Sequence, residues 1–244
     1  MAALRAIVGV GAVVLGSHGF HFYRRSREDE LMALFTDTQD RDTFYRSRHD
    51  QIASTYDSQF ESFEWSKRIH KFRGVLLSYA EGKVLEVGVG TGRNWPYYPK
   101  ECHVVGIDWS LEMLKESDKR ASECKHLILM QMDGRKIKFP DDAFDTVVAT
   151  FALSSCPNPD QMLAEMVRVC RPQGRILVLD RGIGTTFLGN TLLEMYRYEY
   201  LMEYGYDQCL ELEEVVRKAA VDVEVEEHKH GGQLHFYLLR PRKS

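Results

Sequence analysis

The feature that most constrains the fold is an alternation, between about residues 83 and 180, of short apolar runs with segments of helical spacing. Five runs predict strands: KVLEVGV (83–89), HVVGIDW (103–109), HLILMQMD (126–133), FDTVVATFA (144–152) and GRILVLD (174–180). SLEMLKESDKRA, with Ser110 as its N-cap, and DQMLAEMVRVC are predicted helices between them. Because the strands are apolar throughout, they indicate a parallel sheet covered by helices on both faces.

The carboxyl-terminal part departs from this alternation. After a predicted helix, ELEEVVRKAA, the run VDVEVEEH alternates apolar and polar residues as a half-buried edge strand does, and QLHFYLL follows Gly231 and Gly232. Two strands joined by a short glycine turn form an antiparallel hairpin. The sequence therefore predicts a seven-stranded α/β sheet with one antiparallel strand.

Glycines and acids follow the first three predicted strands. In an open α/β sheet, ligands bind beyond the carboxyl ends of the strands, and a glycine turn such as Gly88, Gly90 and Gly92 lets the backbone approach a cofactor. Asp108 ends the second strand, where an acid can accept from ribose hydroxyls, and Asp133 closes the third, as suits an acceptor for an adenine amino group. NAD is the alternative ligand, but GVGTG is not GxGxxG, and no separate domain for hydride transfer is evident.

Together with Glu86, these residues resemble the motifs of the class I S-adenosylmethionine-dependent methyltransferases, specifically the type-11 group that includes the quinone C-methyltransferases. EVGVGTG, VVGIDWS and D-G-(x)5-P-(x)3-FD resemble the first three motifs, and RVCRPQGRILVLD resembles the RVLKPGGRLLVLE segment, with Gln173 in place of a glycine. IASTYD (52–57) resembles the helix before the sheet, so the similarity covers roughly residues 50–180. GTGRNWPYYP more closely resembles a membrane-anchored branch, which includes fungal mitochondrial Oms-type proteins and animal membrane-bound thiol methyltransferases.

The resemblance implies a Rossmann-like methyltransferase fold and S-adenosyl-L-methionine as the cofactor. The implied contacts to the methionine part are Gly88, Gly90, Thr91 and Gly92, with Glu86 at its amino end. The implied contacts to the nucleoside and to the reacting centre are Asp108 at both ribose hydroxyls, Trp109 at the adenine face, Asp133 and Gly134 at the adenine edge, Thr150 and Phe151 near the sulfonium, and Tyr56 and Asn94 as further contacts.

No catalytic residue and no metal site are predicted. Methyl transfer from a sulfonium needs alignment, and it needs a base only if the acceptor must lose a proton. Cys156 is followed by proline and indicates a turn rather than a nucleophile, and the Asn/Asp-Pro-Pro-Tyr box of amino-group methylation is absent because ATFALS occupies its place. The five cysteines are dispersed without Cys/His metal spacing and indicate reduced, buried thiols.

The N-terminal segment AIVGVGAVVLGSHGFHFY (6–23) predicts a membrane anchor. It carries no formal charge, and as a helix it spans about 27 Å, slightly less than a typical hydrocarbon core. Three arginines follow it within residues 24–27, which keeps the rest of the chain on the cytosolic or matrix side. We predict an anchor or targeting segment at 1–27, a linker and helices at 28–80, and the cofactor-binding domain at 81–244. The expected location is the mitochondrial inner membrane, with the endoplasmic reticulum membrane as the alternative.

The acceptor is expected to meet residues 181–210, whose tyrosines form either one face of an amphipathic helix or a lid over an aromatic or lipophilic acceptor. The first hypothesis is a membrane-anchored methyltransferase for a small or lipophilic acceptor, such as a quinone precursor or a thiol. The second is a methyltransferase-like assembly factor or subunit of a mitochondrial complex, ribosomal or respiratory, with little or no turnover. The third is an RNA or protein methyltransferase, although the net charge of −4 provides no general attraction to nucleic acid, and the basic stretches at Lys67–Arg73 and Arg240–Lys243 are expected to be solvated.

Overall fold

The computed structural model of the chain describes residues 38–243. The predicted anchor at 1–27 and the first part of the predicted linker lie outside these residues. Within residues 38–243, none of the helices combines the length and the apolar composition that crossing a bilayer requires.

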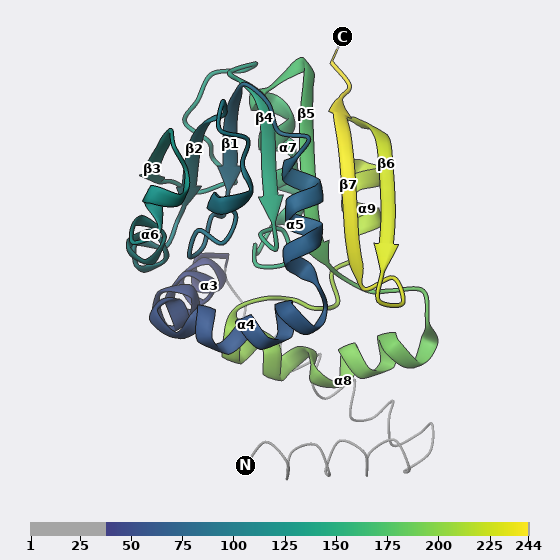
Figure 1. The fold of residues 1–244 in the computed structure, drawn as a ribbon. Coiled ribbons are helices and arrows are strands. Elements are labelled where there is room, and N and C mark those ends of the chain that lie inside the picture. Colours follow the sequence, from purple (N-terminus) through teal and green to yellow (C-terminus); the bar gives the residue numbers. More distant parts are fainter. Residues whose placement is uncertain (1–37, 244) are drawn as a thin grey trace, which may run out of the picture.

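Seven strands form one sheet, in the order β3-β2-β1-β4-β5-β7-β6 (Figure 1). The strands are β1 (Lys83–Val87), β2 (His103–Asp108), β3 (Leu127–Gln131), β4 (Phe144–Thr150), β5 (Cys170–Arg181), β6 (Val221–Lys229) and β7 (Leu234–Pro241). β1 to β5 pair in parallel, whereas β7 runs antiparallel to both β5 and β6. The predicted parallel sheet with a carboxyl-terminal hairpin and one reversed strand is therefore confirmed, and the strand order reverses between β1 and β4.

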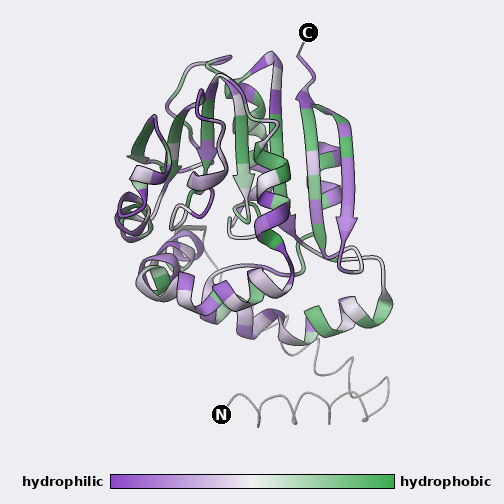
Figure 2. Ribbon diagram, viewed as in Figure 1, coloured by the Kyte–Doolittle hydropathy of each residue, from purple (hydrophilic) through white to green (hydrophobic). Residues whose placement is uncertain are grey.

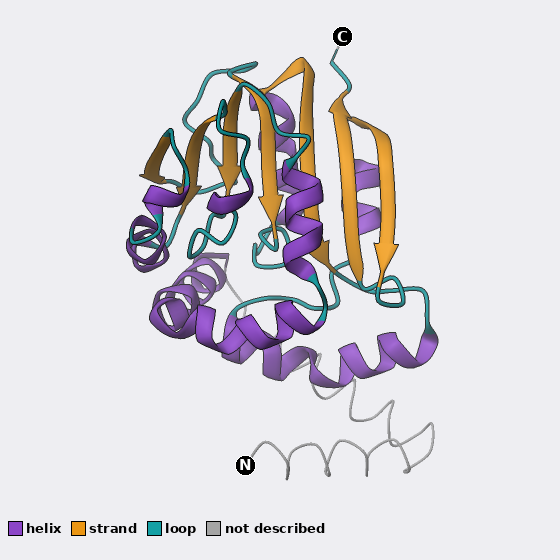
Figure 3. Ribbon diagram, viewed as in Figure 1, coloured by secondary structure: helices purple, strands orange, loops and turns teal. Residues whose placement is uncertain are grey.

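Helices cover both faces of the sheet and also its lower end (Figure 3). The α-helices are α3 (Thr38–Ile52), α4 (Tyr56–Ser66), α5 (Ile69–Leu77), α6 (Leu111–Asp118), α7 (Pro159–Val169), α8 (Phe187–Tyr204) and α9 (Leu212–Lys218), and short 3-10 turns lie at Ala53–Thr55, Trp95–Tyr97 and Ala121–Glu123. α5 lies on one face of the sheet and α7 and α9 lie on the other, while α3, α4 and α8 form a layer beyond the carboxyl ends of β1 to β5 (Figure 1). That layer covers the end at which ligands bind in open α/β sheets.

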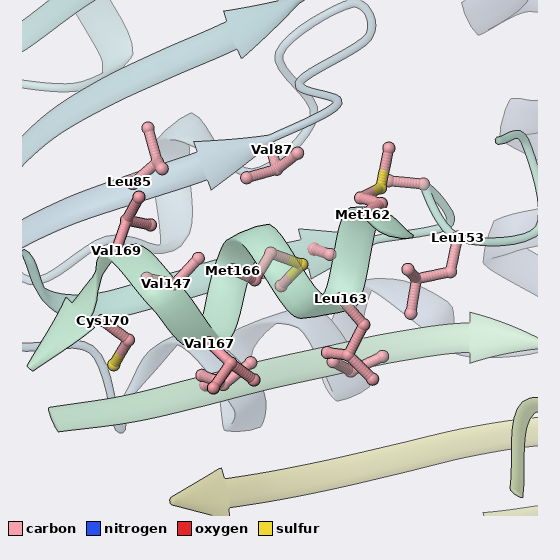
Figure 4. Close-up of a cluster of buried hydrophobic side chains, with 14 of the residues drawn as sticks. Leu85, Val87, Val147, Leu153, Met162, Leu163, Met166, Val167, Val169 and Cys170 are labelled. Atoms are coloured by element: carbon pink, nitrogen blue, oxygen red, sulfur yellow. The ribbon is translucent and has the colours of Figure 1, made fainter. Parts of the chain in front are cut away.

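The core fills both faces of the sheet because its central strands are mainly apolar and buried along most of their length (Figure 2). On one face, Leu163 and Met166 of α7 pack with Leu85 and Val147 (Figure 4). On the other face, Leu76 and Leu77 of α5 belong to a second cluster that includes Val84, Val148 and Leu177. Each fully buried side chain of this kind contributes about 1.5–3 kcal/mol through the hydrophobic effect.

Local signals set most of the element boundaries. The Ser110 hydroxyl accepts a hydrogen bond from the Met113 amide at 3.1 Å, which confirms the predicted N-cap of α6. The predicted strand 144–152 ends earlier, at Thr150, because Phe151 adopts a left-handed backbone with φ of 55°. Its amide still donates to the Leu179 carbonyl at 2.8 Å, so the chain turns away from the sheet while remaining attached to β5. β5 begins at Cys170, four residues before the predicted start, directly after α7.

Candidate functional site

The glycine turn after β1 lies at the point where the strand order reverses, and its glycines have different structural roles. A side chain at Gly92, where φ is 78°, would lie 2.0 Å from Trp95 Nε1, so this glycine makes room for the Trp95 indole and its hydrogen bond to the Ser117 hydroxyl. A side chain at Gly90, where φ is 54°, would meet nothing within 4 Å. The backbone at Gly90 therefore borders open space, as the wall of a ligand site must.

Asp108 lies at the end of β2 beside this turn. Its Oδ2 accepts a hydrogen bond from the Gly90 amide at 2.9 Å, and its Oδ1 accepts one from the Ser110 amide at 2.9 Å. Asp108 forms no ion pair with any described residue, and burial raises its pKa to about 6. Each carboxylate oxygen keeps unused capacity to accept, so a pair of ligand hydroxyls would be well matched to this side chain.

A cavity at this position brings together most of the predicted site residues. The predicted residues that line it are Tyr56, Gly88, Gly90, Thr91, Asp108, Trp109, Asp133, Gly134, Thr150 and Phe151. Their side chains come from α4, from the ends of β1, β2 and β4, and from the segment after β3, which is how a parallel sheet gathers residues that are distant in sequence. Glu86, Gly92 and Asn94 do not line the cavity.

Glu86 and Asn94 lie behind the cavity wall, so they depart from the predicted cofactor contacts. The alternation of side chains along β1 directs Glu86 toward the same face as Val84, where its Oε1 accepts from Asn94 Nδ2 at 2.9 Å and its Oε2 accepts from the Tyr98 hydroxyl at 2.5 Å. Burial raises the pKa of Glu86 to about 7. Both residues therefore belong to a buried hydrogen-bond network with Arg73, Tyr98 and Thr150, and the sequence pattern could not distinguish this role from direct contact.

Arg73 of α5 lines the cavity and was predicted to lie in a solvated basic stretch. That prediction is wrong, because Arg73 is 5% exposed. Its guanidinium donates to Glu64 Oε1, Asn94 Oδ1 and Thr150 Oγ1 at 2.8–2.9 Å, while its Nε is buried without a hydrogen-bond partner. The available signal was its spacing, since Arg73 follows Ile69 by four residues and precedes Leu76 by three, on the buried face of the helix.

The Arg73 contacts also leave the Thr150 hydroxyl able to donate. Thr150 Oγ1 accepts from both Arg73 and Asn94, and its own proton has no acceptor among the described residues. A carboxylate entering the cavity at this wall would find the Thr150 hydroxyl as an unused donor, and Arg73 Nε is a second unused donor, which neighbouring atoms cover. With the open space at Gly90 and the unpaired Asp108, these donors fit the carboxylate and ribose of S-adenosyl-L-methionine.

The predicted adenine contacts are engaged with other protein groups. Both oxygens of Asp133 accept from Arg135, at 2.7–3.0 Å, and this ion pair holds the pKa of Asp133 below its usual value. The Arg135 guanidinium also lies over the Trp109 ring, 5.3 Å from its centroid, and it binds Asp42 of α3. Arg135 thus covers one face of the indole that was predicted to meet adenine. A carboxylate has more acceptor positions than Arg135 uses, so Asp133 keeps capacity for a further donor.

Helix α3 closes the cavity from the side of Trp109. The Trp109 indole N–H donates to His49 Nδ1 at 3.0 Å, and His49 Nε2 lies 3.2 Å from the Gly205 carbonyl. Only a neutral imidazole with its proton on Nε2 satisfies both contacts, and burial lowers the pKa of His49 to about 4, which keeps the ring neutral. His49 therefore joins the cavity wall to the end of α8, a link that no sequence motif indicated.

Tyr56 and Asp57, the Tyr-Asp pair before the sheet, have different positions relative to the cavity. Tyr56 lines the cavity, whereas Asp57 accepts from the Thr91 hydroxyl at 2.7 Å and from Arg93 at 2.9 Å.

Cys156 also lines the cavity, but burial raises the pKa of its thiol to about 12. A thiol with so high a pKa is a weak nucleophile at neutral pH, in agreement with the interpretation of this residue as part of a turn.

One group of three potential metal ligands lies apart from the cavity, on the β6–β7 hairpin and α9. Among the described residues, Glu213, His228 and His235 place ligand atoms within 4.8 Å of one another. His228 Nε2 already contacts Glu226 at 2.8 Å, and His235 Nε2 contacts the Ile183 carbonyl at 3.0 Å.

The comparisons with known proteins agree with the methyltransferase fold. The family model described as a methyltransferase domain matches residues 85–178, which run from β1 to β5. A phosphatidylethanolamine N-methyltransferase of Cereibacter sphaeroides is 45% identical over 102 residues, which cover 41% of this chain and 50% of that protein. The chain thus spans half the length of this relative.

A second relative is covered more fully. The ubiquinone/menaquinone biosynthesis C-methyltransferase UbiE of Geotalea daltonii is 32% identical over 166 residues, which cover 64% of this chain and 71% of the relative. Among solved structures, a chain of the Haloferax volcanii complex between the Trm112 methyltransferase activator and a methyltransferase superposes with a TM-score of 0.62 at 18% identity, covering 79% of this chain and 97% of that one. At this identity the structural likeness concerns the fold alone.

Proposed function

Because the chain belongs to the class I S-adenosylmethionine-dependent methyltransferases of the type-11 group, we propose that it transfers a methyl group from S-adenosyl-L-methionine to a small or lipophilic acceptor of the quinone-precursor or thiol type. The observation that carries the proposal is the meeting of two cavities at Phe151. The first is the cavity beside the glycine turn, and the second, of about 480 Å³, lies between α4 and α8 and shares Phe151, Tyr204 and Tyr206 with the first.

The residues of the first cavity would hold the cofactor. When bound, S-adenosyl-L-methionine supplies an electrophilic methyl group on a sulfonium. Asp108 would accept from the ribose hydroxyls, and Arg73 and Thr150 would donate to the methionine carboxylate. Phe151, at the boundary of the cavities, would keep water from the reacting atoms. A thiolate or an ionised enol needs no general base.

The acceptor side of the proposal draws on the relatives and on exposed apolar side chains. One relative is named for phosphatidylethanolamine and the other for ubiquinone and menaquinone biosynthesis, and all of these molecules are lipophilic. Phe187 and Leu188, in the first turn of α8, are 87% and 64% exposed. Together with the apolar segment 6–23, these residues support a protein held at a membrane, and we propose the mitochondrial inner membrane, with the endoplasmic reticulum membrane as the alternative.

A second candidate function follows from Arg135. This side chain lies against Trp109 and Asp133, where the adenine is expected, and it is tied to Asp42. If Arg135 holds this position permanently, the chain is a methyltransferase-like assembly factor or subunit of a mitochondrial complex with little or no turnover. Calorimetric titration with S-adenosyl-L-methionine separates the two candidates. An RNA or protein methyltransferase is a weaker alternative.

We expect the protein to bind S-adenosyl-L-methionine with micromolar affinity in calorimetric titration, and Asp108→Ala to lose about 100-fold or more of that affinity. The reason is that two charge-assisted hydrogen bonds disappear together, each contributing about 1.5–3 kcal/mol. Asp118→Ala is the matched control, because Asp118 is exposed at the end of α6 and lies outside the cavity.

Binding that responds in this way justifies a search for acceptors with radiolabelled methyl groups. If the folded wild-type protein binds no S-adenosyl-L-methionine, the enzyme proposal fails and the assembly-factor candidate takes its place. If Asp108→Ala binds as tightly as the wild type, the cofactor does not lie beside the glycine turn.

A further inference from the structure

The second cavity combines aromatic walls with positive charge. Six aromatic side chains line it: Phe60, Phe63, Phe151, Tyr200, Tyr204 and Tyr206. Its volume of about 480 Å³ falls in the usual range for sites that bind small molecules. The charged or titratable side chains in its wall, apart from tyrosines, are Lys67, Arg181 and His230, and no Asp or Glu of the described part of the chain lines it.

Arg181, the last residue of β5, is the half-buried cation of this cavity. Its guanidinium carbon lies 4.4 Å from the centroid of the Tyr206 ring, 4.9 Å from that of Phe151 and 5.8 Å from that of Phe63. These cation–π contacts hold the guanidinium in place and offset part of its desolvation. They supply no hydrogen-bond acceptor within the plane of the guanidinium, where its five N–H groups point.

The nearby carboxylates are already occupied. Asp180 accepts from the Leu153 amide and from the Ser154 hydroxyl, at 2.8 and 2.6 Å, and from the backbone amide of Arg181 itself. Glu64 pairs with Arg73 and Arg93. Across residues 38–243, the Arg181 side chain forms no ion pair and no hydrogen bond, so a half-buried cation faces a cavity whose described lining contains no carboxylate.

Two guanidinium groups flank the junction of the cavities. Arg73 lies 5.1 Å from the Phe151 centroid and Arg181 lies 4.9 Å from the same centroid. Arg73 lines the first cavity and is paired with Glu64, whereas Arg181 lines the second and is unpaired. The first cavity is also lined by Arg93 and Arg135, which are paired with carboxylates as Arg73 is, so among the described arginines of the two walls only Arg181 has a complete fork of donors to offer.

We propose that Arg181 binds the anionic head group, a carboxylate or phosphate, of an acceptor whose aromatic or apolar body lies against the Tyr and Phe side chains of the second cavity. The planar fork of an arginine matches both kinds of oxyanion through paired hydrogen bonds. This inference rests on the proposed methyltransferase function only where it identifies the bound molecule as the methyl acceptor. The anion site itself depends only on the cavity and on Arg181. It narrows the substrate class from lipophilic molecules in general to lipophilic or aromatic acids.

The test measures equilibrium binding of matched probes to the full-length protein. The probes are para-hydroxyphenylacetate, its neutral amide para-hydroxyphenylacetamide, and para-hydroxybenzylphosphonate. We expect the wild type to bind the carboxylate or the phosphonate about 10- to 100-fold more tightly than the amide, because a charge-assisted pair is lost in the amide. The tighter of the two anions identifies the head group, and equal binding of all three probes would overturn the proposal without any variant.

Variants then assign the preference to Arg181. Arg181→Gln should bind the anions and the amide equally, and Arg181→Lys should keep part of the preference as a point charge without the fork. Arg217→Gln, on the exposed surface of α9, is the matched control and should behave as the wild type does. If Arg181→Gln is folded and retains the anion preference, the proposal is wrong.

The same samples separate this inference from the proposed function. Titration with S-adenosyl-L-methionine should give the same affinity in Arg181→Gln as in the wild type, within about 3-fold, because Arg181 does not line the first cavity. Anion preference without cofactor binding would remove the methyltransferase proposal and keep the anion site. Cofactor binding without anion preference would remove the anion site and keep the methyltransferase proposal.

Discussion

Gly90 and Gly92 lie two residues apart in one turn, and the physical reason for a glycine differs between them. At Gly92 a side chain would collide with the Trp95 indole, so the residue serves packing. At Gly90 a side chain would project into open space beside Asp108, so the residue serves access to the backbone. The spacing of the glycines predicted the turn, but only the positions of Trp95 and Asp108 reveal which glycine faces a ligand.

Asp108 makes cofactor binding depend on pH. Burial raises the pKa of its carboxyl to about 6, and only the ionised form can accept from both ribose hydroxyls. Below that pKa a proton must leave before the cofactor binds, so we expect the affinity for S-adenosyl-L-methionine to be about 10-fold weaker near pH 5 than near pH 8. Calorimetric titration across this range measures the slope.

Two variants assign that slope to Asp108. Asp108→Asn should bind weakly at every pH without a slope. Glu86 also titrates in this range, since burial raises its pKa to about 7, but it lies behind the cavity wall. Glu86→Gln should therefore keep the slope. A slope that persists in Asp108→Asn, or that disappears in Glu86→Gln, would mean that another group controls binding.

At the scale of elements, α3 acts as the side wall of the first cavity. It is held by His49, which contacts Trp109 and Gly205, by Asp50, which accepts from the Ser110 hydroxyl, and by Asp42, which pairs with Arg135. These contacts are polar, in contrast to the apolar packing of α5 and α7 on the sheet. Elements with few buried apolar contacts open locally at a lower cost in free energy than the core does.

We expect His49→Ala to lower the free energy of unfolding by about 2 kcal/mol, because two hydrogen bonds are lost and the Trp109 N–H loses its acceptor. The amides of residues 38–52 should exchange with solvent faster, and the affinity for S-adenosyl-L-methionine should fall. Ser47→Ala is the control, since the Ser47 hydroxyl donates to Phe44 within the same helix. Unchanged exchange in α3 would show that His49 does not hold this helix.

The elements themselves were largely predictable because their signals are local. Each central strand is an apolar run of strand length, and the hairpin follows from Gly231 and Gly232 between alternating segments. Where the prediction failed, a long-range contact decided the outcome: Phe151 leaves the strand early while its amide bonds to Leu179, and Arg73 is buried because Glu64, Asn94 and Thr150 surround its guanidinium.

At the scale of the whole molecule, the arrangement of layers explains which parts of the site the sequence could predict. Residues at the carboxyl ends of parallel strands must meet, so Gly90, Asp108 and Thr150 were predictable as a group. His49 of α3 lies in the wall of the first cavity and Arg181, at the end of β5, lies in the wall of the second, and no motif marks either residue. Their roles arise from how the layer of α3, α4 and α8 closes over the sheet (Figure 1).

That same layer presents the exposed Phe187, Leu188 and Leu192 of α8, and we expect the full-length protein to associate with phosphatidylcholine vesicles through residues 1–27. In a flotation experiment the full-length protein should rise with the vesicles and resist washing at high salt, because apolar insertion is not screened by ions. The protein lacking residues 1–27 should remain at the bottom. Val13→Asp is the matched full-length variant, since a charge at the centre of a span costs about 2.5–3.5 kcal/mol and should reduce flotation. If the shortened protein floats as well as the full-length protein, α8 carries the membrane contact and the anchor prediction is wrong.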